Sequence, residues 1–454
     1  MPFRKKMLPP ISLPILSFGL VILLGTVLLH SPISLAQTQI SWVDALFTAT
    51  SATCVTGLVV VDTGTFFSRF GQSVILCLIQ VGGLGIMTFT GLTFYLWRRH
   101  VSLTDRIAIG QSLLHDPSFH LGKFLLRIVI WTFFIEAVGA LFLYLQDSRG
   151  FSPYAALFHA VSAFCNAGFG LRADSLMAWQ GHWGINLVIM ILIFLGGIGF
   201  SVVVEIFSGV AKWFRAPRSA RRFRVSWYGQ VVLSTSCFLV VAGGAAIFLA
   251  ENVGYGWQPP TVDPVLTALF QSVTCRTAGF NSVDISQMTN VSLLVMLILM
   301  FIGGAPGSCA GGIKVTTFRA LVGFVAAQVR GGDQVVIGRF AVDREAMSRA
   351  MILMVFAGGI ILSATMLLNI TEGGTLPHQT ARGLFLEAMF ETVSAFGTVG
   401  LSTGLTPKLT VAGKLIIAAV MFIGRLGPVV FLVTLHRFYE EKFYSWPEEN
   451  MLIG

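Results

Sequence analysis

The chain has 454 residues, of which 55% are hydrophobic and 11% are charged, and its formal net charge is +9. A soluble domain carries about 25% charged residues, so the composition excludes an ordinary soluble protein and indicates an integral membrane protein. Apolar stretches of about 20 residues without alternation predict helices rather than a barrel. The positive charge falls in loops between these stretches, so we expect the lipid bilayer, and not nucleic acid, as the partner.

The apolar stretches predict eight transmembrane helices in four pairs. The first helix of each pair is expected near 11–30, 123–146, 226–250 and 346–369, and the second near 72–97, 184–213, 290–330 and 411–438. The first stretch resembles a cleavable signal peptide. We expect it to be retained as a helix, because the short segment that follows it needs a preceding span, as the other three have.

A short segment between the two helices of each pair recurs four times. The copies read ALFTATSATCVTG (45–57), ALFHAVSAFCNAG (156–168), ALFQSVTCRTAG (268–279) and AMFETVSAFGTVG (388–400). Their closing glycines are 111, 111 and 121 residues apart. Each copy is too short and too polar to span a bilayer, so the pattern is span, re-entrant segment, span.

These units define the predicted fold class, an all-α integral membrane protein. Four consecutive repeats, each a span, a re-entrant P-loop and a span, would surround one pseudo-fourfold pore. The predicted boundaries are 1–97 for repeat 1, 98–213 for repeat 2, 214–330 for repeat 3 with an intramembrane gating loop at 303–317, and 331–454 for repeat 4 with a C-terminal tail.

Irregular backbone at membrane depth is tolerated only where it is buried in protein or lines water. Four such loops converge naturally on an axis, where backbone carbonyls can replace the hydration shell of a monovalent cation. Glycine allows the backbone conformations that aim those carbonyls inward. The candidate cation ligands are Val55, Thr56, Gly57, Asn166, Ala167, Gly168, Thr277, Ala278, Gly279, Thr398, Val399 and Gly400.

The distribution of basic residues predicts orientation. Of the 30 lysines and arginines, 21 lie on one side of the predicted spans. The positive-inside rule places that side, with both termini, in the cytoplasm and the re-entrant segments on the outer face.

A second glycine pattern follows each segment within the second helix of the pair. The first two copies, Gly82 to Gly85 and Gly196 to Gly199, are typical of close helix packing, and a functional role is the alternative. The third expands into GGAPGSCAGGIKVTT (303–317), which cannot sustain a helix and predicts a gating loop. The predicted gate residues are Gly303, Gly304, Gly307, Gly311, Gly312, Lys314 and Arg425.

Arginines at membrane depth are costly and face a polar cavity or a partner. Arg425 in the fourth copy either hydrogen-bonds loop carbonyls or forms an electrostatic barrier to cations, and the two roles are compatible. Arg276, three residues before Gly279, is expected to brace the third loop rather than contact the ion.

TCVTG, FCNAGF, CRTAGFN and GTVGLSTG resemble the four filters of the Trk/Ktr/HKT superfamily of cation transporters. GGAPGSCAGGIK resembles its intramembrane loop, and FIGRLGP its last-helix arginine motif. About ten residues precede the first predicted span and the chain ends in WPEENMLIG, so the resemblance is strongest to the membrane subunits of bacterial Ktr-type potassium uptake systems.

The resemblance implies a multi-pass protein of the bacterial plasma (inner) membrane. It implies a homodimer in which each protomer has its own pore, regulated by a cytosolic nucleotide-binding ring. The family associates glycine in all four filters with potassium preference and serine in the first with sodium, so Gly57 and its three counterparts favour potassium.

Three function classes remain open at this stage. The leading hypothesis is a gated, channel-like potassium uptake pore driven by the membrane potential. The second is a secondary transporter coupled to sodium or protons. A membrane enzyme is the third and least favoured, since no His/Cys/Asp cluster has metal-ligand spacing. Potassium is expected as the transported ion, with no covalently bound cofactor.

Overall fold

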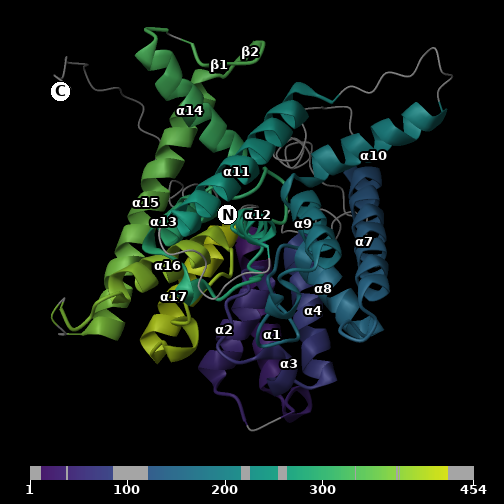
Figure 1. Ribbon diagram of the computed structural model, residues 1–454, viewed down its shortest axis with the longest axis vertical. Coiled ribbons are helices and arrows are strands. Elements are labelled where there is room, and N and C mark those ends of the chain that lie inside the picture. The colour runs from purple at the N-terminus through teal and green to yellow at the C-terminus, as the bar shows by residue number, and fades with distance from the viewer. Residues whose placement is uncertain are drawn as a thin grey trace, which may run out of the picture.

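The computed structural model describes residues 12–36, 39–84, 121–215, 225–253, 263–332, 334–374, 377 and 379–427 (Figure 1). Within these residues the regular secondary structure is helical apart from one short hairpin, as the all-α prediction requires. The predicted helical residues 85–97 and 428–438, and the tail beyond them, lie outside the described part.

The described helices follow one another in a recurring order of long, short and long. The first group is α1 (Ser12–His30), α2 (Trp42–Thr53) and α4 (Arg69–Leu84), and the second is α7 (Leu121–Gln146), α8 (Pro153–Phe164), α9 (Trp183–Gly197) and α10 (Phe200–Arg215). The third is α11 (Trp227–Asn252), α12 (Pro264–Thr274), α13 (Asn290–Phe301) and α14 (Val315–Val329), and the fourth is α15 (Arg344–Gly373), α16 (Leu384–Gly397) and α17 (Val411–Leu426). Single turns lie between them: η1 (Pro32–Ser34), α3 (Thr63–Phe66), η2 (Met177–Trp179), η4 (Ile285–Gln287) and η5 (Thr406–Lys408).

Among the described residues, three helices are long and apolar enough to cross a membrane. They are Leu125–Gln146, Trp227–Asn252 and Arg344–Gly373, each the first long helix of its group. The other apolar helices are shorter within the described ranges, or belong to a bent pair. The prediction of eight complete spans therefore stays a prediction.

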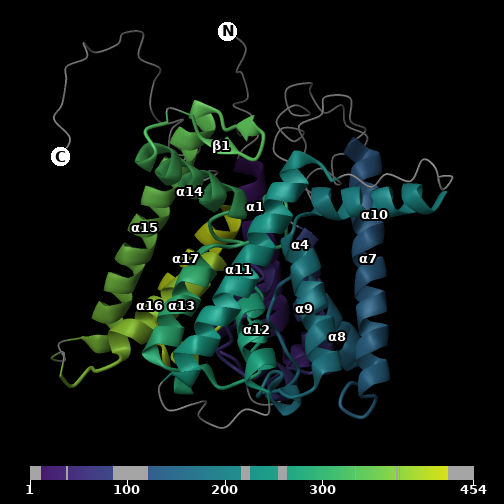
Figure 2. The ribbon, with the colours of Figure 1, turned by 45° about the horizontal axis from the view of Figure 1, so that its top comes forward.

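The helix predicted near 184–213, which the glycine pattern Gly196 to Gly199 interrupts, is divided into two helices. The chain bends by 109° between α9 and α10, and α10 lies across the ends of the long helices, at the end of the bundle that carries β1 (Figure 2). The bend is possible because Gly199 takes a φ of +90°, which side chains with a Cβ rarely adopt. The predicted break within 290–330 is confirmed, since α13 ends at Phe301 and α14 begins at Val315.

A two-stranded antiparallel hairpin, β1 (Val336–Ile337) with β2 (Phe340–Ala341), was not predicted. Two residues per strand are too few to create an alternating pattern. The indole Nε1 of Trp227 donates a hydrogen bond of 2.9 Å to the carbonyl oxygen of Ile337, so the hairpin is attached to the start of α11.

The short helices begin at polar caps and are held by their apolar first turns. The side chains of Ser41, Ser152 and Asp263 accept hydrogen bonds from first-turn amides of α2, α8 and α12, which satisfies donors that a helix start leaves free. In the Ala-Leu/Met-Phe motif of all four helices the alanine and phenylalanine are buried. Each short helix is thus enclosed by neighbouring helices over most of its length.

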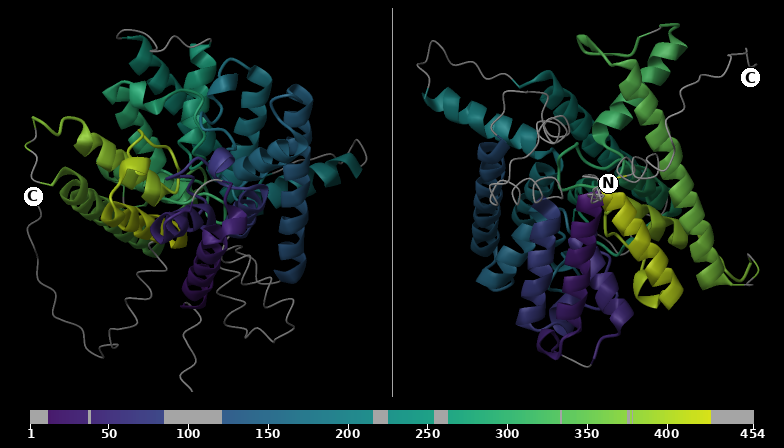
Figure 3. Two further views of the ribbon diagram at one scale, coloured as in Figure 1. Left: turned by 90° about the horizontal axis from the view of Figure 1, so that it is seen from below. Right: turned by 180° about the vertical axis from the view of Figure 1, so that it is seen from behind.

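The groups contact one another in cyclic order. The helix after each short helix contacts the short helix of the next group, in the pairs α4 with α8, α9 with α12, α13 with α16, and α17 with α2. Viewed from below, the groups follow one another in chain order around a common centre (Figure 3). The last group meets the first, so the described helices enclose this centre.

Candidate functional site

Each short helix ends in a loop with the same unusual backbone. The residue two positions before the closing glycine is left-handed in every copy: Val55 (φ 57°), Asn166 (59°), Thr277 (71°) and Thr398 (49°). The glycines also have positive φ, at 94°, 69°, 78° and 91° in chain order. Positive φ is uncommon for a residue with a side chain, so four unlike sequences are folded into one conformation.

Hydrogen bonds back to the short helix hold these loops. The amides of Thr56, Ala167 and Val399 each donate to the carbonyl of the serine five residues earlier, at 2.7 to 2.8 Å. The third segment is one residue shorter, and there Ala278 donates to Thr274, four residues earlier, at 2.9 Å. A tighter turn thus compensates the deletion and keeps Gly279 in register with the other glycines.

Two serines brace the glycines directly. The amide of Gly57 donates to the Oγ of Ser51 at 3.1 Å, and the amide of Gly400 donates to the Oγ of Ser394 at 3.0 Å. In the first and fourth loops these amides are therefore used within the protein, which leaves the carbonyl oxygens free to face the centre.

The four glycines pack against one another's loops in a closed ring. A Cβ placed on Gly57 would lie 2.4 Å from the carbonyl oxygen of Ala167, and one on Gly168 would lie 2.7 Å from that of Ala278. On Gly279 it would lie 2.3 Å from the oxygen of Val399, and on Gly400 it would lie 2.0 Å from that of Thr56. Every glycine therefore abuts the carbonyl that precedes the next glycine, and the fourth returns to the first.

The second glycine pattern serves close packing, as one of the two interpretations predicts. A Cβ on Gly82, Gly196 or Gly424 would lie 1.9 to 2.0 Å from a carbonyl oxygen at the end of the short helix in its own group. These glycines let the second long helix press against the base of the loop. The loops are thus supported from below by backbone rather than by side chains.

The third glycine pattern forms an irregular loop beneath the ring. The amide of Gly303 donates to the carbonyl of Ile313 at 2.8 Å, and the amide of Val315 donates to that of Gly304 at 3.0 Å, so the base of the loop is closed. Beside this base a Cβ on Gly311 would lie 2.3 Å from the Oγ1 of Thr398. The loop therefore reaches the underside of the fourth segment.

The bend between α9 and α10 receives the far side of this loop. The amides of Ala305 and Cys309 donate to the carbonyls of Gly197 and Gly196, at 2.9 and 3.2 Å, and the amide of Phe200 donates to that of Gly307 at 2.9 Å. In a continuous helix these two carbonyls and the amide of Phe200 would form hydrogen bonds within the helix. The bend leaves them free to bind the loop. The bend that sequence reasoning missed is thus part of the loop's docking site.

Two basic side chains bind this loop. Arg425 donates to the carbonyl oxygens of Cys309 and Gly82, and the Nζ of Lys314 donates to that of Ala310 at 2.7 Å. Neither makes an ion pair with any residue in the described ranges. Arg425 thus hydrogen-bonds loop carbonyls, which is the first of the two roles that the sequence suggested. Its charge has no ion-pair partner among the described residues, as the second role requires.

Arg276 extends from the third segment toward the same loop. Its guanidinium donates to the carbonyl of Gly303 at 3.1 Å and to the carbonyl and hydroxyl of Ser236 on α11, both at 3.4 Å. These bonds place the guanidinium against α11 and the start of the irregular loop. They fit the bracing role that the sequence suggested.

Sequence reasoning assigned no partners to two glutamates. Glu136 on α7 accepts a hydrogen bond of 3.1 Å from Gln80 of α4, and Glu205 on α10 accepts from the amide and hydroxyl of Ser226 at the start of α11. Both join neighbouring groups of helices. An ionisable residue in an apolar stretch was the available signal, but it could not identify the partner.

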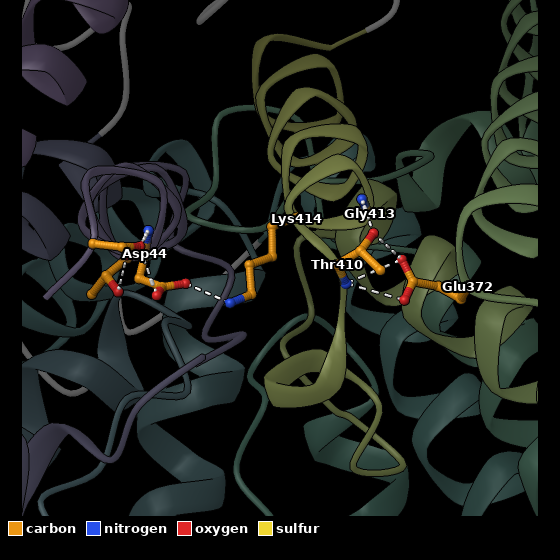
Figure 4. Close-up of polar contacts among 7 residues, drawn as sticks. Asp44, Glu372, Thr410, Gly413 and Lys414 are labelled. Carbon is orange, nitrogen blue, oxygen red and sulfur yellow. Dashed lines mark hydrogen bonds and ion pairs between the residues drawn. The ribbon is translucent and has the colours of Figure 1, made fainter.

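An ion pair between the last group and the first was also missed. The Nζ of Lys414 on α17 lies 2.6 Å from the Oδ1 of Asp44 on α2, and both side chains are largely buried (Figure 4). One turn earlier on α17, the hydroxyl of Thr410 donates to Glu372 of α15 at 2.7 Å. The contact that closes the ring of helices is therefore electrostatic as well as apolar.

A bundle of apolar helices in which four glycine loops pack in a closed ring is typical of a membrane transport protein. The family of cation transport proteins called TrkH matches residues 17–445. The chain belongs to this family.

Full-length relatives agree with this assignment. The chain is 40% identical to the Ktr system potassium uptake protein B of Bacillus subtilis, over 98% of this chain and 97% of that protein. It is 36% identical to the protein of the same name from Vibrio alginolyticus, over 97% of this chain and 94% of that one. It is 35% identical to the potassium/sodium uptake protein NtpJ of Enterococcus hirae, over 99% and 98% respectively.

A solved structure has the same fold. The crystal structure of the potassium transporter TrkH from Vibrio parahaemolyticus superposes with a TM-score of 0.69, covering 95% of this chain and 86% of that chain at 20% sequence identity. The family match, the Ktr relatives and this shared fold together confirm the resemblance.

Proposed function

We propose that the chain is the potassium-selective translocating subunit of a potassium uptake system, with channel-like flux driven by the membrane potential. The observation that carries the proposal is the closed ring of four glycine loops, each abutting the carbonyl before the next glycine. The potassium uptake function that the names of two relatives state supports the choice of ion. Rings of backbone carbonyls that replace a hydration shell are a known basis of such selectivity.

In this proposal the ligands are the three residues that end each segment. They are Val55, Thr56 and Gly57, then Asn166, Ala167 and Gly168, then Thr277, Ala278 and Gly279, and finally Thr398, Val399 and Gly400. Loop amides bonded to the short helices support this assignment, because such loops can present carbonyls without collapsing. One glycine per loop predicts looser selectivity than that of the TVGYG loops of potassium channels.

The proposal includes eight transmembrane helices in four repeats around one pseudo-fourfold pore, with the boundaries given above. The cyclic packing of the helices supports it. The basic loops predict that both termini lie in the cytoplasm, and the family resemblance implies the bacterial plasma membrane. A homodimer and a cytosolic nucleotide-binding ring are proposed from the family resemblance.

The gate in this proposal is the loop at 303–317, held by Arg425. Its position beneath the ring, its attachment to the α9–α10 bend and its two basic contacts support that role. The glycines Gly303, Gly304, Gly307, Gly311 and Gly312 allow the loop to change shape. The unpaired charges of Lys314 and Arg425 would oppose a cation that enters from below.

The alternative is a potassium transporter coupled to sodium or protons. The Enterococcus relative is named a potassium/sodium uptake protein, which favours sodium as the coupled ion. Potassium fluxes in proteoliposomes at a clamped voltage separate the two. A passive pore gives a current that reverses at the potential set by the gradients of its permeant ions and their permeability ratio. At a clamped voltage such a pore cannot move potassium against the electrochemical gradient of potassium. Potassium accumulation at a clamped voltage, driven by a gradient of sodium or protons, would establish coupling instead.

A further inference from the structure

One position in each short helix carries a buried polar side chain that differs in type from copy to copy. It follows the Ala-Leu/Met-Phe motif directly and is occupied by Thr48, His159, Gln271 and Glu391 in chain order. Each of these side chains is at most 2% exposed. Burial of a polar or charged group is costly unless it is hydrogen-bonded, so the partners of these four side chains show what the position does.

Glu391 links its short helix to the segment that leaves the ring. Its Oε1 accepts a hydrogen bond from the hydroxyl of Ser402, and its Oε2 accepts one of 2.6 Å from the hydroxyl of Thr406. Ser402 is only two residues past Gly400. Both carboxylate oxygens are therefore used to fasten the chain on the exit side of the fourth loop to α16.

The second and third groups make the same link with different chemistry. The Nε2 of Gln271 donates to the hydroxyl of Ser282 at 3.3 Å, and the amide of Leu171 donates to the Nε2 of His159 at 3.5 Å. Each partner lies three residues past its closing glycine. Three unlike side chains thus connect the same two places, so the link is a property of the position rather than of one residue type.

The first group lacks this link. The hydroxyl of Thr48 donates to the carbonyl of Asp44 in its own helix at 2.8 Å. The segment after Gly57 reads Leu58-Val59-Val60-Val61 and offers no polar side chain. Thr48 is therefore an internal control, because it occupies the same position without reaching the exit segment.

We propose that Glu391 is a positioning residue for selectivity: it fixes the fourth loop by fastening its exit segment to the short helix. Gln271 and His159 do so more weakly in the third and second loops. The inference rests on the proposed function, since it assumes that these loops select the ion. Glu391 forms the strongest of the three links, because it makes two hydrogen bonds to the exit segment, whereas Gln271 and His159 make one each.

The test compares four variants with the wild type in proteoliposomes, using the K⁺/Na⁺ permeability ratio from bi-ionic reversal potentials. Glu391→Leu removes both hydrogen bonds, and Ser402→Ala removes one from the partner side. Glu391→Gln keeps the length of the side chain, and its amide can still bond both hydroxyls, because a hydroxyl accepts as well as donates. Thr48→Val is the matched control at the equivalent unlinked position.

We expect the permeability ratio to fall about tenfold in Glu391→Leu, corresponding to about 1.4 kcal/mol, and by a smaller factor in Ser402→Ala. Glu391→Gln and Thr48→Val should stay close to wild type. Size-exclusion profiles and Tm identify variants that do not fold. If Glu391→Leu does not fold, Ser402→Ala decides, because its side chain is only half-buried.

An unchanged ratio in folded Glu391→Leu or Ser402→Ala would overturn the inference, and so would a Glu391→Gln variant as defective as Glu391→Leu. An equal loss in Thr48→Val would also overturn it, since burial rather than the link would then be responsible. Absence of potassium flux in the wild type would instead refute the proposed function, so the two failures are distinguishable.

Discussion

The closed ring predicts how strongly each glycine resists replacement by alanine. The added Cβ would lie closest to a neighbouring carbonyl oxygen at Gly400, at 2.0 Å, and farthest at Gly168, at 2.7 Å, with Gly279 and Gly57 between at 2.3 and 2.4 Å. Real Cβ atoms keep at least 3.0 Å from such atoms. Each substitution must therefore push a proposed ligand carbonyl out of place, by the largest amount at Gly400.

Two costs must be separated in this series. Positive φ strains alanine by about 1–2 kcal/mol at any of these positions, whereas displacement of a ligand carbonyl is specific to the ring. Gly404 provides the control: its φ is +96°, it lies four residues past Gly400, and no atom lies within 4 Å of a Cβ placed on it. Gly404→Ala pays the strain without the collision.

The assay is the K⁺/Na⁺ permeability ratio of each purified variant, with Tm measured in parallel. We expect a fall of about tenfold or more in Gly400→Ala, a factor that corresponds to about 1.4 kcal/mol of lost discrimination. The loss should decrease through Gly279 and Gly57 to Gly168. Gly404→Ala should stay within about twofold, as surface substitutions within about 0.5 kcal/mol do.

The reasoning is refuted if Gly404→Ala loses as much selectivity as Gly400→Ala, because backbone strain alone would then explain the effect. It is also refuted if the ring variants fold normally and keep wild-type selectivity. In that case the glycines would serve only as helix caps, and the carbonyls beside them would not be ligands.

Three further outcomes test the gate and the closure of the helical ring. Arg425→Gln should raise basal potassium flux at normal expression, since it removes an unpaired charge and a loop contact; a fall in flux would show that the arginine supports the open state. Deletion of 305–311 should raise flux and leave the permeability ratio unchanged, because the base of the loop is already closed by hydrogen bonds; wild-type flux in a folded deletion variant excludes gating by this loop. Lys414→Met should lower the free energy of unfolding by about 1–3 kcal/mol, between the values for exposed and buried ion pairs. The variant in which Asp44 and Lys414 exchange charges should recover part of this loss. No change in Tm for either variant would show that the ion pair is dispensable.

The ends of the short helices were predictable because their signal is local. Glycine is required where the chain has positive φ and packs directly on a neighbouring backbone. Gly57 and its three counterparts occupy such positions, so the requirement is visible in the sequence. The break after Phe301 was predictable for the same reason, since five glycines and a proline cannot sustain a helix.

The features that escaped prediction depend on tertiary partners. The sequence around Gly199 allowed a helix with a packing glycine as well as a 109° bend, and only the loop that docks against the bend distinguishes them. The carboxylate of Glu391 likewise appears in the sequence as a polar residue in an amphipathic helix. Its two hydroxyl partners lie 11 and 15 residues away, and no periodic pattern connects such positions.

The four loops share a backbone but not their supports, and in the proposed function this difference separates ion selection from gating. A carbonyl ring needs only equivalent backbone, so Thr56, Ala167, Ala278 and Val399 can differ freely in side chain. Regulation needs the opposite, because an obstacle that opens must be attached unequally. The loop at 303–317 belongs to the third group of helices and docks on the α9–α10 bend of the second group. Arg425 of the fourth group holds it. An exactly fourfold assembly of one segment could form the ring, but it could not place a single obstacle beneath it. Fusion of four units into one chain permits each to keep the glycine loop and to change everything below it.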